Sequence, residues 1–443
     1  MATVRAATAP VLRTSLRPSS ARYCGRIGGG GGATSRMTGV ASVRWKSGPY
    51  GYTQAKALVF SQYGEPKDAL KLHTHSISPN LPSSSVLLRT LAASINPADV
   101  NTIQGTYGAK PTFSSLIGTS EPSALPGNEG VFEIASTPPS SSSGLVKGDW
   151  VIPAKTGFGT WRTHAVAPLE SVIKVEKEGL SPIQVGTVSV NPCSAYRMLR
   201  DYATPPLREG DWFIQNGANS GVGRAAIQLG RLWGYRSINV IRARENPEDT
   251  KALKDELAAL GADRVVTEEE FLAREFRDAV AEWTRGSGGG VRLGLNCVGG
   301  KSAQNIAKTL GTSGTMVTYG GMARQPVALP TGLLIFKDLR FVGFWLSRWA
   351  DGDTTAKART VNEILDLIRQ GKFRDTPVVD VPWNWETEEN TLKEAVQGTL
   401  EGFRAVLIEA EASYLVHLFN MRSVAMFKEL YLTALLACEF MIA

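Results

Sequence analysis

Two groups of residues in this 443-residue chain have the types and spacing of a dinucleotide site. Trp212–Gln215 has the composition of a buried strand and leads into a turn that contains Gly217, Gly221 and Gly223. A tight glycine turn between a strand and a helix lets backbone N–H groups face a pyrophosphate. The glycines do not match the G-x-G-x-x-G pattern, so the turn predicts a nucleotide site only together with its surroundings.

The second group follows nineteen residues after this turn, where a strand at Ser237–Ile241 ends on Arg242-Ala-Arg244. An enzyme that uses NAD would carry an acidic residue near this point to bind the ribose hydroxyls. Arginine is a permanently charged planar fork that suits an additional phosphate. The pair therefore predicts NADPH as the cofactor and a reductase as the activity. The alternative is a solvated arginine pair after a strand.

The elements around these residues alternate in the manner of a doubly wound parallel sheet. An amphipathic helix at Glu248–Leu260 places Leu253, Leu257 and Leu260 on one face and ends at Gly261 as a C-cap. The alternation continues through the strand Arg264–Thr267, a helix at Glu269–Trp283, the strand Val291–Val298, a helix from Ser302 and the strand Gly314–Tyr319.

The segment before the glycine turn has a different pattern. From Tyr52 to about Pro192, short apolar runs are broken by Pro, Gly and Ser clusters, which predicts an all-β body. The predicted strands are Gln54–Phe60, Ser85–Leu91, Glu129–Ala135 and Asp149–Pro153. A helix at Pro192–Tyr202 leads into the alternating segment, and the mixed pattern returns after Gly320. A nucleotide-binding domain inserted into a β-rich domain would place the active site between them.

The net charge of +7 comes from the first fifty residues. They hold eight of the 48 basic residues, and no Asp or Glu occurs before Glu65, so 40 basic residues face 41 acidic ones afterwards. A leader rich in Arg and Ser and free of acids is typical of a mitochondrial transit peptide; the alternative is a disordered basic tail. The rest is nearly neutral, so we expect no nucleic-acid partner.

Neither the cysteines nor the C-terminal tail predicts a site. The four cysteines (Cys24, Cys193, Cys297 and Cys438) and the four histidines are scattered, so we expect no metal and no disulfide framework. The segment Glu411–Ala443 is apolar but interrupted by charges, and we expect an artefact of gene prediction or a dispensable tail, without a membrane span. The alternative is a helix that binds a partner.

Several ordered motifs resemble the mitochondrial 2-enoyl thioester reductases, which belong to the zinc-free branch of the medium-chain dehydrogenase/reductase superfamily. The resemblance extends from about Ala55 to Ile408. It implies an α/β chain with a GroES-like β-rich catalytic domain and an inserted Rossmann domain. The matching segments are Asn96–Gly108, Gly127–Gly130, Asn191–Leu199, Gly217–Gly223, Asn296–Lys301, Met316–Met322, Leu334–Leu339 and Gly343–Ser347.

The resemblance implies that Tyr107, in the Gln-Gly-Thr-Tyr-Gly loop, is the proton donor. Reduction of an α,β-unsaturated thioester places negative charge on an enolate, which a phenol near the α-carbon or the thioester oxygen can quench or stabilise. Without the motif, Tyr107 would be interpreted as a loop residue that packs its ring on a rim.

The resemblance also implies a set of cofactor residues. Asn191 would lie on the nicotinamide side, unless it is an ordinary helix cap. Arg242 and Arg244 would take the 2′-phosphate, although Ala243 stands where relatives commonly have Asp. Tyr319–Met322 could instead be a plain glycine turn, and the Phe344–Trp345 pair could be simple core. The implied residues are Asn191, Asn219, Ser220, Gly221, Val222, Arg242, Ala243, Arg244, Tyr319, Gly320, Gly321, Met322, Phe344, Trp345, Leu346, Ser347 and Arg404, the last as the nearest counterpart of a basic residue in the terminal strand.

We therefore expect an NADPH-dependent trans-2-enoyl reductase of the mitochondrial matrix that acts on acyl-carrier-protein or CoA thioesters in fatty acid synthesis, with a homodimer as the default assembly. The alternatives are a quinone or small-enone reductase, and a nucleotide-binding protein without catalysis. The expected domains are a transit peptide at 1–49, the catalytic domain at 50–192 and 346–410, the Rossmann domain at 193–345 and the tail at 411–443.

Overall fold

The computed structural model describes residues 51–138, 144–399 and 404–409. The expected transit peptide at 1–49 and the expected tail at 411–443 lie outside these ranges, so their structure is not part of the description below.

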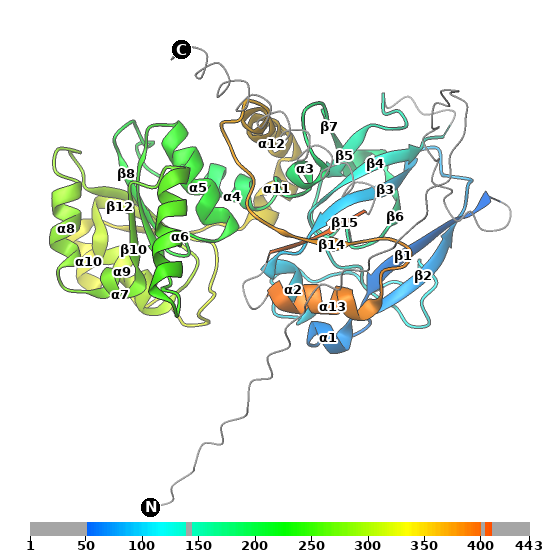
Figure 1. Ribbon diagram of the computed structural model, residues 1–443, viewed down its shortest axis with the longest axis horizontal. Coiled ribbons are helices and arrows are strands. Elements are labelled where there is room, and N and C mark those ends of the chain that lie inside the picture. Colours follow the sequence, from blue (N-terminus) through cyan, green and yellow to red (C-terminus); the bar gives the residue numbers. More distant parts are fainter. Residues whose placement is uncertain (1–50, 139–143, 400–403, 410–443) are drawn as a thin grey trace, which may run out of the picture. The chain divides into compact units, whose positions relative to one another are not determined.

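The alternating segment forms a six-stranded parallel sheet (Figure 1). The strand order is β10-β9-β8-β11-β12-β13, so β8, the first strand along the chain, lies between β9 and β11. Ligands of such sheets bind where the strand order reverses, outside the carboxyl ends of the strands. The strands are β8 Trp212–Gln215, β9 Arg236–Ile241, β10 Arg264–Thr267, β11 Val291–Asn296, β12 Leu310–Thr318 and β13 Arg340–Gly343.

Helices cover both faces of this sheet because successive strand residues point to opposite sides. Phe213 packs with residues of α4 and α5, whereas Trp212 and Ile214 pack with residues of α8 and α9. The predicted Rossmann architecture is therefore confirmed. The helices are α4 Asn191–Asp201, α5 Gly221–Leu232, α6 Pro247–Leu260, α7 Glu268–Leu272, α8 Phe276–Trp283, α9 Gly300–Thr309 and α10 Thr331–Lys337.

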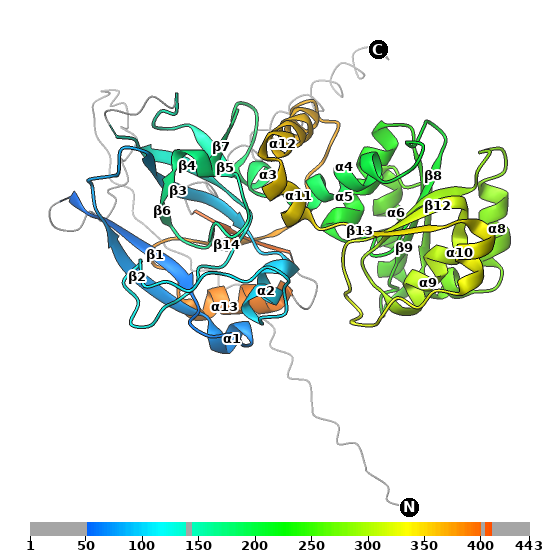
Figure 2. The same ribbon diagram turned by 180° about the vertical axis from the view of Figure 1, so that it is seen from behind.

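The β-rich segment forms a seven-stranded sheet and a separate two-stranded hairpin, β1–β2 (Figure 2). The order of the larger sheet is β14-β15-β3-β4-β5-β7, and β6 also pairs with β3. Since β15 near the C-terminus pairs with β3, the chain returns to its first sheet after the parallel one. The strands are β1 Thr53–Val59, β2 Lys71–Ile77, β3 Ser85–Ser94, β4 Gly130–Ser136, β5 Trp150–Pro153, β6 His164–Pro168, β7 Val172–Val175, β14 Val379–Pro382 and β15 Ala405–Ile408.

The expectation of an all-β body before Pro192 is wrong, because three short helices interrupt the strands. Each of them begins with a proline, a residue whose fixed φ and missing N–H suit the first helical position. Three further helices lie after β13. The six helices are α1 Pro66–Ala69, α2 Pro97–Ile103, α3 Pro182–Gly186, α11 Leu346–Gly352, α12 Thr354–Arg369 and α13 Glu389–Gly398.

The single helix expected at Glu269–Trp283 is also wrong, because the structure has α7 and α8 with a break at Ala273. Phe271 and Phe276 are both buried, and their rings meet edge to face at 5.0 Å. Residues five apart do not share one face of a continuous helix, so the break lets both rings enter the core. The predicted helix cap at Gly261 is confirmed, with φ at +114°.

Candidate active site

Tyr107 lies in the turn that follows α2. The backbone N–H groups of Thr106 and Tyr107 both donate to the carbonyl of Asn101, at 2.9 and 3.1 Å. These two bonds hold the loop against the end of α2, and the side chain of Tyr107 is half-buried.

The Tyr107 hydroxyl contacts two residues from the segment after β13. Trp345 Nε1 donates to Tyr107 Oη at 2.8 Å, and Ser347 Oγ lies 3.2 Å from the same oxygen. An indole N–H is a donor only, so Tyr107 Oη accepts from Trp345 and keeps its own proton for Ser347 or for a substrate. Two predicted groups some 240 residues apart in the sequence thus meet at one oxygen.

Phe344 and Trp345, which the sequence could place either in the core or at the site, have different surroundings in the structure. Phe344 is 7% exposed and packs in the core, edge to face with Tyr202. Trp345 is 42% exposed, and its ring meets that of Tyr107 at 81°, with the ring centroids 6.1 Å apart. The core interpretation therefore fits the side chain of Phe344, whereas Trp345 belongs to the surroundings of Tyr107.

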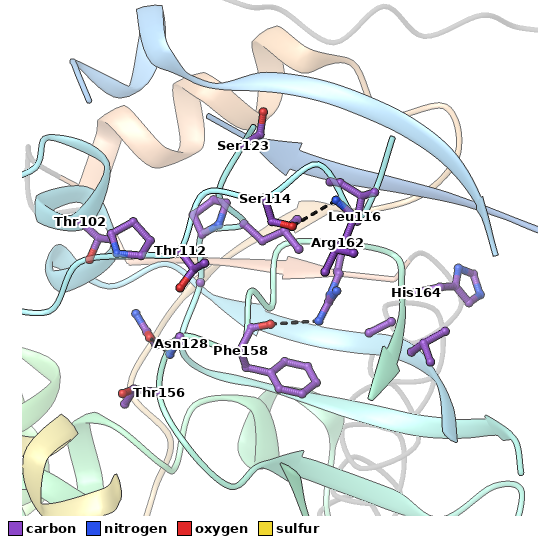
Figure 3. A pocket seen from close by; sticks show the side chains of 18 of the residues that line it. Thr102, Thr112, Ser114, Leu116, Ser123, Asn128, Thr156, Phe158, Arg162 and His164 are labelled. Atoms are coloured by element: carbon purple, nitrogen blue, oxygen red, sulfur yellow. Dashed lines mark hydrogen bonds between the residues drawn. The ribbon is translucent and has the colours of Figure 1, made fainter. Parts of the chain in front are cut away.

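A cavity of about 700 Å³ opens beside Tyr107 and Ser347 (Figure 3). This volume lies within the range of small-molecule sites. Among the described residues that line it there is no Asp or Glu. The lining groups that can titrate are His75, Tyr107, Lys110, Arg162 and His164.

The glycine turn between β8 and α5 has no room for side chains. Gly217 has φ at +62°, and a Cβ on Gly223 would lie 2.5 Å from the carbonyl oxygen of Ala218. A Cβ on Gly221 would lie 2.9 Å from Asn191 Cγ. Ser220 caps α5, since its Oγ accepts from the N–H of Gly223 at 3.1 Å. The turn thus exposes backbone and the start of a twelve-residue helix, as a dinucleotide pyrophosphate requires.

Positive charge gathers at this turn. Arg404 Nη2 donates to the carbonyl of Asn219, and Arg224 donates to Asn219 Oδ1 at 2.7 and 2.9 Å. Burial lowers the pKa of Arg404 to about 10, and the charges of Arg224 and Arg244 act in the same direction, while Glu256 opposes them. Arg404, from the terminal strand segment, therefore reaches the turn, where an anionic ligand would reduce the repulsion between these cations.

Arg242 and Arg244 lie at the carboxyl end of β9 with exposed side chains. Neither arginine forms an ion pair with a residue that the structure describes. The backbone N–H of Arg244 donates to Thr250 Oγ1 at 2.8 Å, which fixes the chain between β9 and α6. Two unpaired guanidinium groups beside the glycine turn fit the 2′-phosphate of NADPH.

Asn191 is the first residue of α4, and Val190 precedes it as the N-cap without a side-chain bond. The helix-cap interpretation of Asn191 is therefore wrong. Its Nδ2 donates to Asn96 Oδ1 at 3.0 Å, and Asn96 in turn donates to Glu129 at 2.9 Å. Because Glu129 directly precedes β4 and also accepts from the N–H of Val190 at 2.7 Å, the start of α4 is connected to the seven-stranded sheet.

Glu129 and Asp99 are buried carboxyl groups that the sequence did not assign to the site. Burial raises the pKa of Glu129 to about 7 and that of Asp99 to about 6, against hydrogen bonds that favour the ionised forms. Asp99 accepts from the N–H of Asn96 at 2.9 Å and from Asn128 Nδ2 at 2.7 Å. In the sequence, Glu129 stands directly before the apolar strand β4. A buried acidic side chain at such a position needs hydrogen-bond partners, and this position could have indicated the network.

The segment Tyr319–Met322 begins where β12 ends. The N–H of Met322 donates to the carbonyl of Cys297 at 2.9 Å, and a Cβ on Gly320 would lie 3.2 Å from Cys297 Cβ. A Cβ on Gly217 would lie 2.5 Å from Cys297 Sγ. The buried thiol of Cys297 thus supports both glycine turns, which meet at the carboxyl edge of the sheet.

No group of three His, Cys, Asp or Glu side chains within 51–138, 144–399 and 404–409 is placed to hold a metal ion. Over the same ranges, no helix combines the length and the apolar character needed to cross a membrane.

Comparison with known proteins shows the family to which the chain belongs. Residues 221–366 match the family model described as zinc-binding dehydrogenase. A protein of Yarrowia lipolytica named mitochondrial enoyl-[acyl-carrier-protein] reductase is 48% identical over 323 residues, which are 73% of this chain and 82% of that protein. The human protein of the same name is 43% identical over 74% of this chain and 83% of its own length. The chain belongs to the mitochondrial enoyl-[acyl-carrier-protein] reductase family.

A solved structure described as the Etr1p/NADP/crotonyl-CoA complex has a TM-score of 0.75 and 39% identity to this reductase. It covers 80% of this chain and 99% of the other. The expected fold and the resemblance are therefore confirmed.

Proposed function

We propose that this chain reduces trans-2-enoyl thioesters to saturated acyl thioesters with NADPH, and that Tyr107 donates the proton. The observation that supports this most directly is the pair of contacts on Tyr107 Oη, from Trp345 and from Ser347, beside a cavity large enough for an acyl chain. Bound NADPH supplies the hydride that reaches the β-carbon of the substrate.

The chain then has to manage the negative charge that develops at the α-carbon and the thioester oxygen. The Tyr107 O–H transfers its proton to the α-carbon, and the oxygen keeps the electron pair of the broken O–H bond. The indole N–H of Trp345 already points at this oxygen and stabilises the charge left there. The Ser347 hydroxyl, at 3.2 Å, can donate to the same oxygen until solvent returns a proton.

We assign the cofactor contacts as the motifs imply. Asn219, Ser220, Gly221 and Val222 would hold the pyrophosphate, and Arg242, Ala243 and Arg244 would surround the 2′-phosphate. Asn191 would face the nicotinamide half, and Tyr319–Met322 would contact the cofactor at the carboxyl end of β12. Trp345, Leu346 and Ser347 would line the nicotinamide and acyl site. Asn191, Gly221 and Arg404 also line a common small cavity of about 50 Å³, which supports this grouping. We keep the domain boundaries at 192/193 and 345/346.

We further propose that the substrate arrives on acyl carrier protein or CoA in the mitochondrial matrix, and that the chain forms a homodimer. The relatives carry the word mitochondrial in their names, which supports the organelle. A related solved structure is described as an Etr1p/Etr2p heterodimer from Candida tropicalis, with 38% identity and a TM-score of 0.75 over 80% of this chain and 99% of that one, which supports assembly in pairs.

NADPH oxidation by the purified chain tests this function with crotonyl-CoA and, separately, with a small quinone. We expect turnover with the thioester and little with the quinone. Tyr107→Phe keeps the ring and removes the donor, so kcat should fall about 10²- to 10⁴-fold while NADPH affinity stays constant. Tyr52→Phe, at an exposed position, is the matched control. Faster quinone reduction, or a Tyr107→Phe variant with the wild-type rate, would remove the proposal.

A further inference from the structure

Arg162 lies in the wall of the cavity with a backbone that several contacts fix. Its N–H donates to the carbonyl of Thr160, and its own carbonyl accepts from the hydroxyl of Thr90. The preceding residue, Trp161, is fully buried, and its indole donates to the carbonyl of Ser94 at 3.0 Å. These contacts fix the backbone from which the Arg162 side chain extends to the cavity.

The guanidinium of Arg162 has few partners. Nη2 donates to the carbonyl of Phe158 at 2.9 Å, and the group stacks over the Phe158 ring at 5.2 Å from the centroid. Nε is buried and has no hydrogen-bond partner within the described residues. Arg162 forms no ion pair with these residues either. Figure 3 shows the side chain between Phe158 and Leu116, with Asn128 and Thr156 on one side and His164 on the other.

The groups that surround Arg162 do not supply a negative charge. Burial lowers the pKa of Arg162 to about 10, which leaves the guanidinium charged at neutral pH. Burial is also the main cause that lowers the pKa values of His75 and His164 to about 4, so both rings are neutral at pH 7. No carboxyl group lines this cavity among the described residues. A buried charge without a partner is costly, and a ligand anion would remove that cost.

The cavity that contains Arg162 is the one that contains Tyr107 and Ser347. A ligand with its double bond at Tyr107 can therefore extend toward the guanidinium. The lining of the same cavity also offers apolar groups such as Ile117, Leu125 and Phe158. This combination suits a chain whose middle is apolar and whose far end is an anion, since a guanidinium group can bind a carboxylate by charge-assisted hydrogen bonds.

We propose that Arg162 is a specificity residue that binds a carboxylate at the far end of the acyl chain, so that ω-carboxy-trans-2-enoyl thioesters are substrates of this reductase. The proposal rests on the proposed reductase function. The site would recognise the chain end while the chemistry at Tyr107 stays the same: one hydride and one proton add across the double bond, and the distal carboxylate is unchanged.

The test compares pairs of trans-2-enoyl-CoA substrates of equal length, from six to twelve carbons, that end in a methyl group or in a carboxylate. For at least one length we expect the carboxylate member to have the higher kcat/KM. Arg162→Met should lower the carboxylate-to-methyl ratio of kcat/KM at least tenfold at that length, because a charge-assisted pair is lost. Arg162→Lys should restore part of the ratio, and Arg274→Met, at an exposed position, should leave it unchanged.

Two further measurements keep the outcome decisive. The same pairs as N-acetylcysteamine thioesters lack phosphate, so an Arg162 dependence that disappears with them would assign the guanidinium to the carrier phosphate and overturn the proposal. Calorimetry with saturated ω-carboxyacyl-CoA and acyl-CoA measures binding without turnover, so it decides the proposal even if no enoyl thioester is reduced. Tighter binding of the carboxylate form that depends on Arg162 supports it, and equal binding overturns it.

Folding gives an independent control. If Arg162 only supported the structure, Arg162→Met would lower the Tm of the ligand-free protein. Removal of a buried charge without an acidic partner should instead leave the Tm equal or raise it. A fall in Tm together with an unchanged substrate ratio contradicts the proposal.

Discussion

The glycine turn after β8 and the surroundings of Tyr107 hold their ligands by different means. At the turn, added Cβ atoms on Gly217, Gly221 and Gly223 would lie 2.5 to 2.9 Å from neighbouring atoms, so steric exclusion fixes the backbone. At Tyr107, two hydrogen bonds to a half-buried hydroxyl define the geometry. A methyl group added to a glycine of the turn should therefore lower both stability and cofactor affinity. A substitution around Tyr107 should instead lower the reduction rate and leave the fold intact.

Gly223→Ala is the strongest test of this contrast. The new methyl group would meet the backbone of Ala218, which cannot rotate away, and we expect a loss of about 3 kcal/mol in unfolding free energy together with weak NADPH binding. Urea unfolding and cofactor titration measure both. Gly352→Ala is the matched control, since an added Cβ there has nothing within 4 Å. A Gly223→Ala protein with normal stability would show that the turn adapts.

Replacing both Arg242 and Arg244 with Ala tests whether their positive charges contribute to NADPH affinity in addition to the close-packed glycine turn. We expect NADPH affinity to fall about 30- to 100-fold while NADH affinity changes little, because only NADPH carries the 2′-phosphate. Fluorescence titration with both nucleotides measures this. Arg285→Ala, an exposed substitution in the same half of the chain, should have no effect. Equal losses for both nucleotides would contradict the assignment.

Trp345→Phe tests the hydrogen bonds around Tyr107. The ring contact with Tyr107 survives but the N–H is lost, so we expect kcat to fall about tenfold with little change in Tm. Steady-state rates and thermal unfolding separate the two effects. Trp283→Phe, at the last residue of α8, where the ring is partly buried against the core and meets that of Phe276, should change stability and leave kcat unchanged. An unchanged kcat in Trp345→Phe would remove the indole from the proton step.

Glu129→Gln tests the hydrogen-bond network of Asn191, Asn96 and Glu129, which connects α4 to the seven-stranded sheet. A carboxyl group whose pKa is raised by burial to about 7 stabilises the fold below its unfolded pKa, and this contribution is lost as pH rises through 7. Glutamine does not titrate, so the stability of the variant relative to wild type should increase by roughly 2 to 3 kcal/mol between pH 5 and pH 8. Urea unfolding at four pH values measures it. Glu170→Gln, on the surface, should give a flat difference.

The sequence predicts best those features that depend on near neighbours. The turn at Gly217–Gly223, the buried Leu253 and Leu257 of α6 and the cap at Gly261 all follow from spacing within one element. The helices at Pro66, Pro97 and Pro182 escaped prediction because a proline was interpreted as the end of a strand and not as the start of a helix. The break between α7 and α8 at Ala273 could not be predicted, because it depends on how the rings of Phe271 and Phe276 pack in the core.

Features that join distant parts of the chain could not be predicted from local pattern. Trp345 and Tyr107 are 238 residues apart, and Asn191 and Asn96 are 95 apart. No periodicity connects such pairs, and only the fold brings them to hydrogen-bond distance. The family resemblance indicates Tyr107, whereas Asn96, Glu129 and Arg162 are distinguished only by their burial and by the partners that each group has or lacks.

The thiol of Cys297 offers an intrinsic kinetic reporter. It lies under Gly217 and Gly320 and is 7% exposed, so an alkylating reagent reaches it only when the two turns separate. The labelling rate of this sulfur therefore counts opening events at the carboxyl edge of the parallel sheet. A dinucleotide that clamps both turns slows the modification in proportion to its occupancy.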